Sequence, residues 1–223
     1  MAIISQFNTQ EYYNFLKVGK ALKRTAEGLS DYAENVIKTF HTSLLQQHGN
    51  AVCSSPGHRK KITYDKTRQS WKINCPSGVC RNWMSSIAAQ YANPNPRNPP
   101  WICWENTNVN DWPVATQSWQ LAKPFMSEGK ASSCNSPADT DPAGIFQLLI
   151  YFKEFAAQGL NIQQVKDVRD IRNALMHSAD SAVKTPDMKA HIQAMITLLQ
   201  EPALSIYQCA RDAINDLRQG AAE

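Results

Sequence analysis

Apolar side chains recur every three or four residues through the first fifty positions of the chain, which is the period of an amphipathic helix. Two helices are expected there, because Ser30 and Asp31 are capping residue types and Glu34 follows Asp31 by three positions. The second helix is expected to end at Gly49, where the apolar pattern stops. The pattern therefore predicts an N-terminal helical pair.

The helical period disappears between residues 50 and 80. Within this stretch the segment ITYDKTRQSWKI, residues 62–73, is typical of two short strands around a turn. A short helix is predicted over 81–92, followed by the proline-rich loop NPNPRNPP. Asp111-Trp112-Pro113 is expected to open a further helix.

The helical pattern returns at Asp141, which is an N-cap residue type followed by proline. Asn161 and Thr185 are the caps expected for the next two helices, and Pro202 is expected to separate them from a last helix over 203–218. The C-terminal part of the chain is therefore predicted to form a bundle of about four helices joined by short loops.

These elements predict a mainly α fold in four segments. The segments are N-terminal helices over 1–50, a small Cys/His-containing insertion over 51–83, a helix-loop-helix connector over 84–140 and a helical bundle over 141–223. A chain of 223 residues can bury a sizeable core without a disulfide framework. No membrane span and no signal peptide are recognised, so a cytoplasmic location with reduced cysteines is expected.

Three cysteines and one histidine in the insertion have a spacing that suits zinc. Cys53 and His58 are five positions apart, as are Cys75 and Cys80, with sixteen residues between the two pairs. Structural zinc sites take two ligands from each of two loops, so the spacing predicts a structural Zn²⁺ site. Cys103 is an alternative ligand. The competing interpretation is that the cysteines are ordinary buried thiols of a reduced protein.

Positive charge is concentrated in the same segment. Residues 53–83 carry seven Lys or Arg residues and one acidic residue, whereas the whole chain has a net charge of +4. Three aromatic residues, Tyr64, Trp71 and Trp83, lie among them, and basic residues interleaved with aromatics suit single-stranded RNA. The competing interpretation is a solvated hairpin whose tryptophans belong to the core. The residues expected to bind RNA are Arg59, Lys60, Lys61, Arg68 and Lys72.

The helix predicted over 162–177 carries a second group of polar residues. At 100° per residue, Asn173 and His177 share a polar face, whereas Arg172 lies on the apolar face. A guanidinium that faces a helix interface requires an anion or a cleft. Arg172 and His177 are about 140° apart around a regular helix, so they do not project in the same direction.

The segment RNALMH, residues 172–177, resembles the Arg-polar-x3-His motif of HEPN domains. Three segments spread along the chain, AVC at 51–53, WPVATQSWQLAKPFMSEG at 112–129 and RNALMHS at 172–178, are similar to the uncharacterised chromosome X open reading frame 38 family. The resemblance implies an HEPN-like helical bundle. It also implies a metal-independent endoribonuclease that acts as a homodimer, with no cofactor needed for catalysis.

The residue types explain how such a site would cleave RNA. His177 would act as general acid or base, Arg172 would stabilise the phosphate, and Asn173 would orient the histidine. A symmetric dimer would bring a second histidine. Two alternatives remain open: a non-catalytic, zinc-stabilised module that binds RNA or a protein partner, and a structural adaptor without affinity for nucleic acid. In the structural interpretation, Arg172 pairs with an acid of a neighbouring helix.

Overall fold

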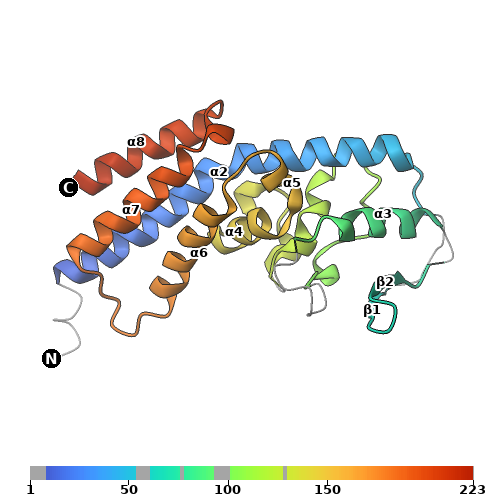
Figure 1. Cartoon of the computed structure of the whole chain (residues 1–223), viewed down its shortest axis with the longest axis horizontal. Coiled ribbons are helices and arrows are strands. Elements are labelled where there is room, and N and C mark those ends of the chain that lie inside the picture. Colours follow the sequence, from blue (N-terminus) through green and yellow to red (C-terminus); the bar gives the residue numbers. More distant parts are fainter. Residues whose placement is uncertain (1–8, 54–60, 76–77, 93–100, 128–129, 223) are drawn as a thin grey trace. The chain divides into compact units, whose positions relative to one another are not determined.

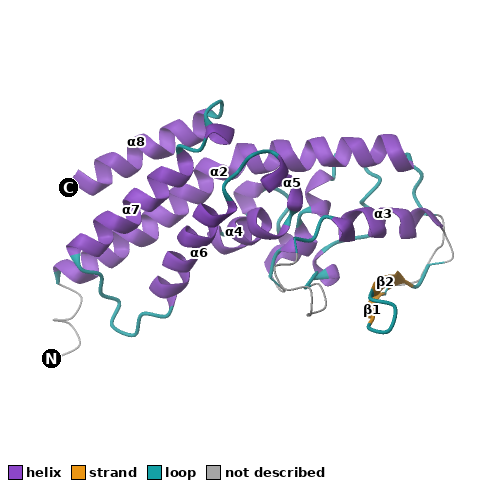
Figure 2. Cartoon of the chain, in the orientation of Figure 1, coloured by secondary structure: helices purple, strands orange, loops and turns teal. Residues whose placement is uncertain are grey.

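The computed structural model of the chain describes residues 9–53, 61–75, 78–92, 101–127 and 130–222. Its helices confirm the mainly α fold (Figures 1 and 2). Among the described residues, no helix combines the length and the apolar character needed to cross a membrane. The helices of more than one turn are α2 (Gln10–His48), α3 (Gly78–Ala89), α4 (Pro142–Tyr151), α5 (Lys153–Ala157), α6 (Ile162–Met176), α7 (Thr185–Leu199) and α8 (Gln208–Ala222).

The chain folds into two compact units. Unit 1 contains the described residues of 1–32, 141–146 and 156–223, and unit 2 contains those of 33–140 and 147–155. Helix α2 supplies residues to both units. Residues 141–146 and 156–223 of the predicted bundle lie in unit 1, together with the first part of α2. Residues 147–155 and the cysteine-containing insertion belong to unit 2.

The prediction of two N-terminal helices is wrong, because residues 10–48 form the single helix α2. Ser30 does not cap a second helix. Its hydroxyl donates to the carbonyl of Ala26 at 3.1 Å, one turn back, and the backbone continues without a break. Leu29 and Tyr32 on either side are buried, so packing keeps this turn helical.

Two of the predicted caps in the C-terminal part are confirmed. The side chain of Asp141 accepts from the backbone N–H of Gly144 at 2.8 Å, at the start of α4. The side chain of Asn161 accepts from the N–H of Gln163 at 3.1 Å and caps α6. Each bond satisfies a donor that the first helical turn would otherwise leave unpaired.

A buried amide and a glycine fix α2 within unit 1. The Asn14 side chain is fully buried and donates to the carbonyl of Val183 and the hydroxyl of Thr185, both at 3.0 Å. Gly28 faces α8 so closely that an added Cβ would lie 2.8 Å from the Cβ of Ala213. The close approach of α2 and α8 therefore depends on glycine at position 28, which has no side chain.

Unit 2 has an aromatic core that includes the fully buried Trp83, Trp112, Phe125 and Phe152. The segment after Pro113 does not form the helix expected there. It forms the 3-10 helices η3 (Ser118–Leu121) and η4 (Lys123–Phe125). Every residue from 118 to 126 is buried, so no solvent-facing side remains for an amphipathic helix.

The connector also contains short 3-10 turns that the sequence pattern did not indicate. Another such turn, η7, precedes α8 in unit 1. These turns are η2 (Trp104–Asn106), η5 (Lys130–Ser133), η6 (Pro137–Asp139) and η7 (Pro202–Leu204).

Two short strands, β1 (Ile62–Asp65) and β2 (Ser70–Ile73), form the predicted hairpin in unit 2. They pair antiparallel with Ile62 opposite Ile73 and Tyr64 opposite Trp71. The Asp65 side chain accepts from the backbone N–H groups of Thr67 and Arg68 at 3.0 and 3.1 Å and closes the turn. The turn is therefore stabilised by two hydrogen bonds from backbone N–H groups to the Asp65 carboxylate.

Replacing Gly28 by valine is expected to destabilise the protein by about 2 kcal/mol, because the new methyl groups would overpack the α2–α8 contact. Chemical denaturation followed by circular dichroism measures the change. Gly220→Ala is the matched control, since a Cβ at Gly220 meets nothing within 4 Å. Equal stability of Gly28→Val and the parent would contradict the close packing.

The stability of the protein is expected to fall as the pH drops below about 6.5. The His41 ring is buried and its Nε2–H donates to the Trp112 carbonyl at 2.8 Å. Burial lowers the pKa of His41, so protonation below the ordinary histidine pKa of about 6.5 favours the unfolded chain. Unfolding titrations from pH 7.5 to pH 5 measure this loss.

His41→Gln is the matched variant, because an amide N–H can still donate to the Trp112 carbonyl without titrating. Its stability is expected to depend less on pH than that of the parent. The remaining dependence is assigned to His48, whose pKa burial also lowers. Identical pH profiles for parent and variant would show that His41 is not responsible.

Candidate metal centre

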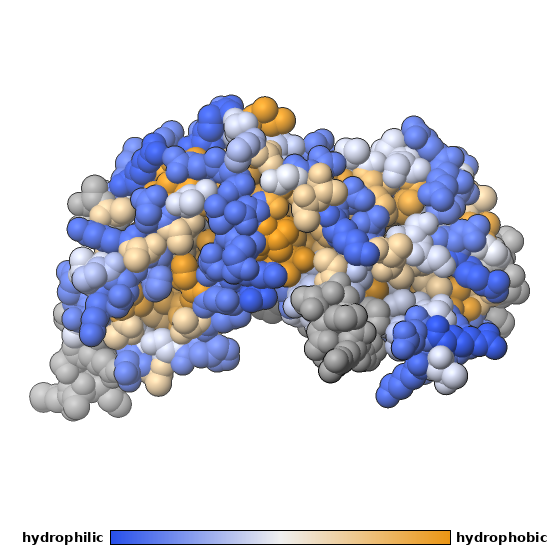
Figure 3. Space-filling model, in the orientation of Figure 1, coloured by the Kyte–Doolittle hydropathy of each residue, from blue (hydrophilic) through white to orange (hydrophobic). Residues whose placement is uncertain are grey.

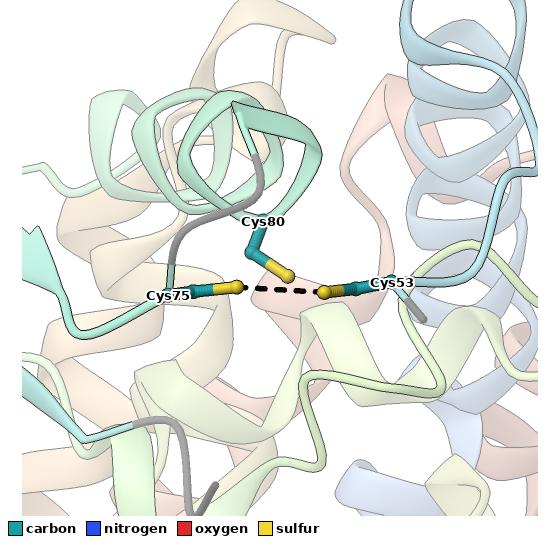
Figure 4. A group of neighbouring side chains, drawn as sticks. All are labelled: Cys53, Cys75 and Cys80. Atoms are coloured by element: carbon teal, nitrogen blue, oxygen red, sulfur yellow. Dashed lines mark hydrogen bonds between the residues drawn. The ribbon is translucent and has the colours of Figure 1, made fainter. Parts of the chain in front are cut away.

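Three of the four predicted metal ligands come together in unit 2. Cys53 follows the end of α2, Cys75 follows β2, and Cys80 lies in the first turn of α3. Their sulfur atoms all lie within 4.8 Å of one another, and the Sγ atoms of Cys53 and Cys75 are 3.4 Å apart. Figure 4 shows the three side chains pointing toward one common point.

The surroundings of the three sulfurs suit a bound metal ion. Cys75 and Cys80 are 6% and 3% exposed, Cys53 is half-buried, and none of the three is in a disulfide. Two thiolates on one tetrahedral zinc ion lie about 3.8 Å apart, given a Zn–S distance of about 2.3 Å. The observed spacing of the sulfurs fits this geometry with small side-chain movements.

Local structure places the second and third cysteines. The hairpin is extended by a bond from Asn74 N–H to the Lys61 carbonyl at 3.0 Å, which leads directly into Cys75. Cys80 is held by α3, whose side chains Trp83 and Ile87 are buried in the core of unit 2.

The two other ligands that the sequence suggested for this site are His58 and Cys103. His58 was the predicted fourth ligand, and it lies outside the described residues. Cys103, the alternative, is buried but is not part of the group of three that the described residues form. The arrangement therefore offers three soft sulfur ligands that can hold one metal ion, with one position of a tetrahedron left for another donor.

The hairpin next to Cys75 presents exposed positive charge. Lys61, Lys66 and Arg68 are exposed and form no ion pair among the described residues. Lys72 differs, because its Nζ lies 2.5 Å from a carboxylate oxygen of Asp65. Figure 3 shows hydrophilic residues over the hairpin. Arg59 and Lys60 were also expected to bind RNA, and they lie outside the described residues.

Asp65 is a structural acid of the hairpin. The hydrogen bond from Lys72 lowers the pKa of this carboxyl group, and the backbone N–H groups of Arg68 and Thr67 act in the same direction. The carboxylate therefore stays charged and neutralises Lys72. Lys61, Lys66 and Arg68 therefore supply the positive charge that the hairpin can offer to an anion.

The aromatic residues of this region have different surroundings. Trp83 is 1% exposed, which places it in the core and removes it as a stacking partner for a base. Tyr64 and Trp71 are half-buried, with ring centroids 5.1 Å apart, and Trp71 also contacts Trp104 at 5.6 Å. The hairpin therefore carries two half-buried aromatic residues beside its cations.

The polar residues of α6 belong to unit 1. Arg172 is half-buried, and its Nη1 donates to the Asn173 side-chain oxygen at 3.3 Å. His177 is exposed and caps the C-terminus of α6. Among the described residues, no hydrogen bond joins Asn173 to the His177 ring. The expected orienting contact is not formed, and the catalytic roles of these three residues stay predictions.

Sequence reasoning assigned no role to Lys123, which is 2% exposed in the core of unit 2. Its ammonium donates to the Ser132 carbonyl at 2.9 Å and to the Asn135 side chain at 3.3 Å. Burial lowers the pKa of Lys123. Its contacts tie η4 to η5 and to Asn135 just after it, which is a structural role. An isolated lysine in a sequence gives no signal of such burial.

Comparison with known proteins identifies the family. The chain belongs to the family described as Domain of unknown function (DUF4559), whose model matches residues 6–219. No curated protein and no solved structure matches the chain. The expected membership of the HEPN superfamily, with the chromosome X open reading frame 38 family as closest relative, is therefore corrected: the matching model describes an uncharacterised family, and no comparison names an HEPN domain. A short Arg-x4-His spacing was too weak a signal, because two residues at that distance occur often by chance.

Cys75→Ser is expected to abolish metal binding by the purified protein. The loss of a bound metal lowers the stability by about 4 kcal/mol when the metal stands 1,000-fold above its dissociation constant. Elemental analysis of the protein and thermal unfolding with and without a chelator measure the two effects. Cys134→Ser is the matched control, because Cys134 is equally buried but lies outside the group of three. Equal metal content in Cys75→Ser and the parent would rule out this centre.

Proposed function

We propose that the protein binds single-stranded RNA through the β1–β2 hairpin, and that the three-cysteine centre holds a structural Zn²⁺ ion which fixes this hairpin. The observation that carries the proposal is the group of exposed cations Lys61, Lys66 and Arg68, which form no ion pair among the described residues, on a hairpin that leads into a cysteine of the candidate metal centre. Cations on a fixed scaffold attract phosphates at a smaller entropic cost than cations on a mobile loop.

Zinc is the metal that the donor set favours. Thiolate ligands select soft or borderline metals, and zinc is the usual ion in structural sites of cysteine with or without histidine. A two-stranded hairpin is marginally stable by itself. A metal bound by Cys53, Cys75 and Cys80 would link it to the end of α2 and to α3, so the ion would have a structural task.

Single strands are favoured over a duplex by the aromatic side chains. Tyr64 and Trp71 are half-buried on the hairpin that carries the cations. Unpaired bases can stack on such rings, whereas the bases of a duplex are stacked on one another. The hairpin therefore offers both phosphate pairing and base contact within a few residues.

The affinity for a labelled single-stranded RNA is expected to fall steeply with salt. Each phosphate contact contributes about 0.7 to the slope of log affinity against log salt, so Lys66→Ala/Arg68→Ala is expected to lower the slope by about 1.4. The turn itself should persist, because Asp65 is held there by backbone N–H groups. Fluorescence anisotropy from 50 to 300 mM salt measures both quantities.

The matched control is Lys166→Ala/Lys189→Ala, which removes two positive charges from unit 1. Its salt slope is expected to equal that of the parent. A parent without affinity, or a control that loses as much affinity as the hairpin variant, would refute the proposal. Incubation with RNA in buffer without added divalent metal, beside His177→Ala, tests separately whether the bound RNA is cleaved.

A further inference from the structure

A groove in unit 1 lies between α2, α7 and α8. Its volume is about 310 Å³, which is at the lower end of the range for small-molecule sites. Figure 1 shows the three helices side by side. The groove is lined by Lys17, Lys20, Ala21, Arg24, Ile192, Asp216, Leu217 and Gly220.

One wall of the groove carries positive charge that the protein does not neutralise. Lys17, Lys20 and Arg24 follow one face of α2 at intervals of three and four residues. Arg24 is paired, with Nε 2.6 Å from Asp216 and Nη1 3.1 Å from Glu27. Lys17 and Lys20 form no ion pair among the described residues.

The floor of the groove is apolar. Ala21, Ile192 and Leu217 are 5%, 3% and 4% exposed and belong to three different helices. Two lysines at an interval of three residues repel each other, so their placement beside this floor does not stabilise α2. A ligand with a negative end and an apolar body would satisfy both features, because its charge would meet the lysines and its body would cover the floor.

We infer that this groove binds a small amphiphilic carboxylate, with the carboxylate between Lys17 and Lys20 and the hydrocarbon part on Ile192 and Leu217. The small volume and the apolar floor favour such a molecule over a polyanion, which would need an extended track of cations. The site is independent of the hairpin, since all of its residues belong to unit 1.

The test is a titration of the full-length protein with decanoate, kept below the concentration at which it forms micelles. Amide chemical shifts are expected to change around Ala21, Leu217 and Gly220. Decanol lacks the charge and acetate lacks the chain, so each is expected to bind at least tenfold more weakly than decanoate. Lys17→Gln and Lys20→Gln are each expected to weaken decanoate binding about fivefold.

Lys23→Gln is the matched control, because Lys23 is an exposed lysine of the same helix that lies outside the groove and faces Glu27 at 4.0 Å. Its affinity for decanoate is expected to equal that of the parent. The inference is overturned if decanol binds as tightly as decanoate, if Lys23→Gln loses as much affinity as Lys17→Gln, or if decanoate does not shift these amides. It is also overturned if a short RNA shifts the same amides more strongly than decanoate does.

Discussion

The rest of the structure depends on the burial of one continuous stripe of α2. An isolated helix in water is stabilised only marginally by its own hydrogen bonds, and a 39-residue helix such as α2 persists because its apolar face is covered. Val18, Leu22 and Leu29 are buried in unit 1, and Ala33 and Ile37 are buried in unit 2. A break in this helix would therefore remove core residues from both units.

The hairpin has the opposite character, because it has too little apolar surface to support itself. Of the residues in its two four-residue strands, only Ile73 is buried, at 8% exposure. Further support comes from the packing of β2 against α3, from the ring contacts of Trp71 and from the cysteine that follows β2. A metal ion is an efficient support in such a place, since a few strong bonds replace a core that the segment cannot form.

The sequence was informative where local chemistry decides the structure. Alternation of residue types gave the hairpin, and Asp141 and Asn161 gave two helix starts, because a capping side chain acts on its own backbone. Prediction from local residue types was wrong at Ser30, where tertiary packing overrides the capping preference of serine. It was also wrong after Pro113, where a completely buried segment forms 3-10 turns in place of an amphipathic helix. The cysteine group was predictable from spacing. The groove was not, since it joins helices far apart in the sequence.

The contacts from Tyr64 through Trp71 and Trp104 to Trp112 form an unbroken series of aromatic rings, with neighbouring centroids 5.1, 5.6 and 5.9 Å apart. Rings at such distances couple their electronic transitions, and near-ultraviolet circular dichroism detects aromatic side chains held in fixed packing. The packing of the hairpin against the tryptophans of unit 2 is therefore expected to contribute to the near-ultraviolet circular dichroism spectrum of the unlabelled protein. These aromatic residues therefore serve as an intrinsic spectroscopic reporter of the hairpin, which the cysteine centre is proposed to hold in place.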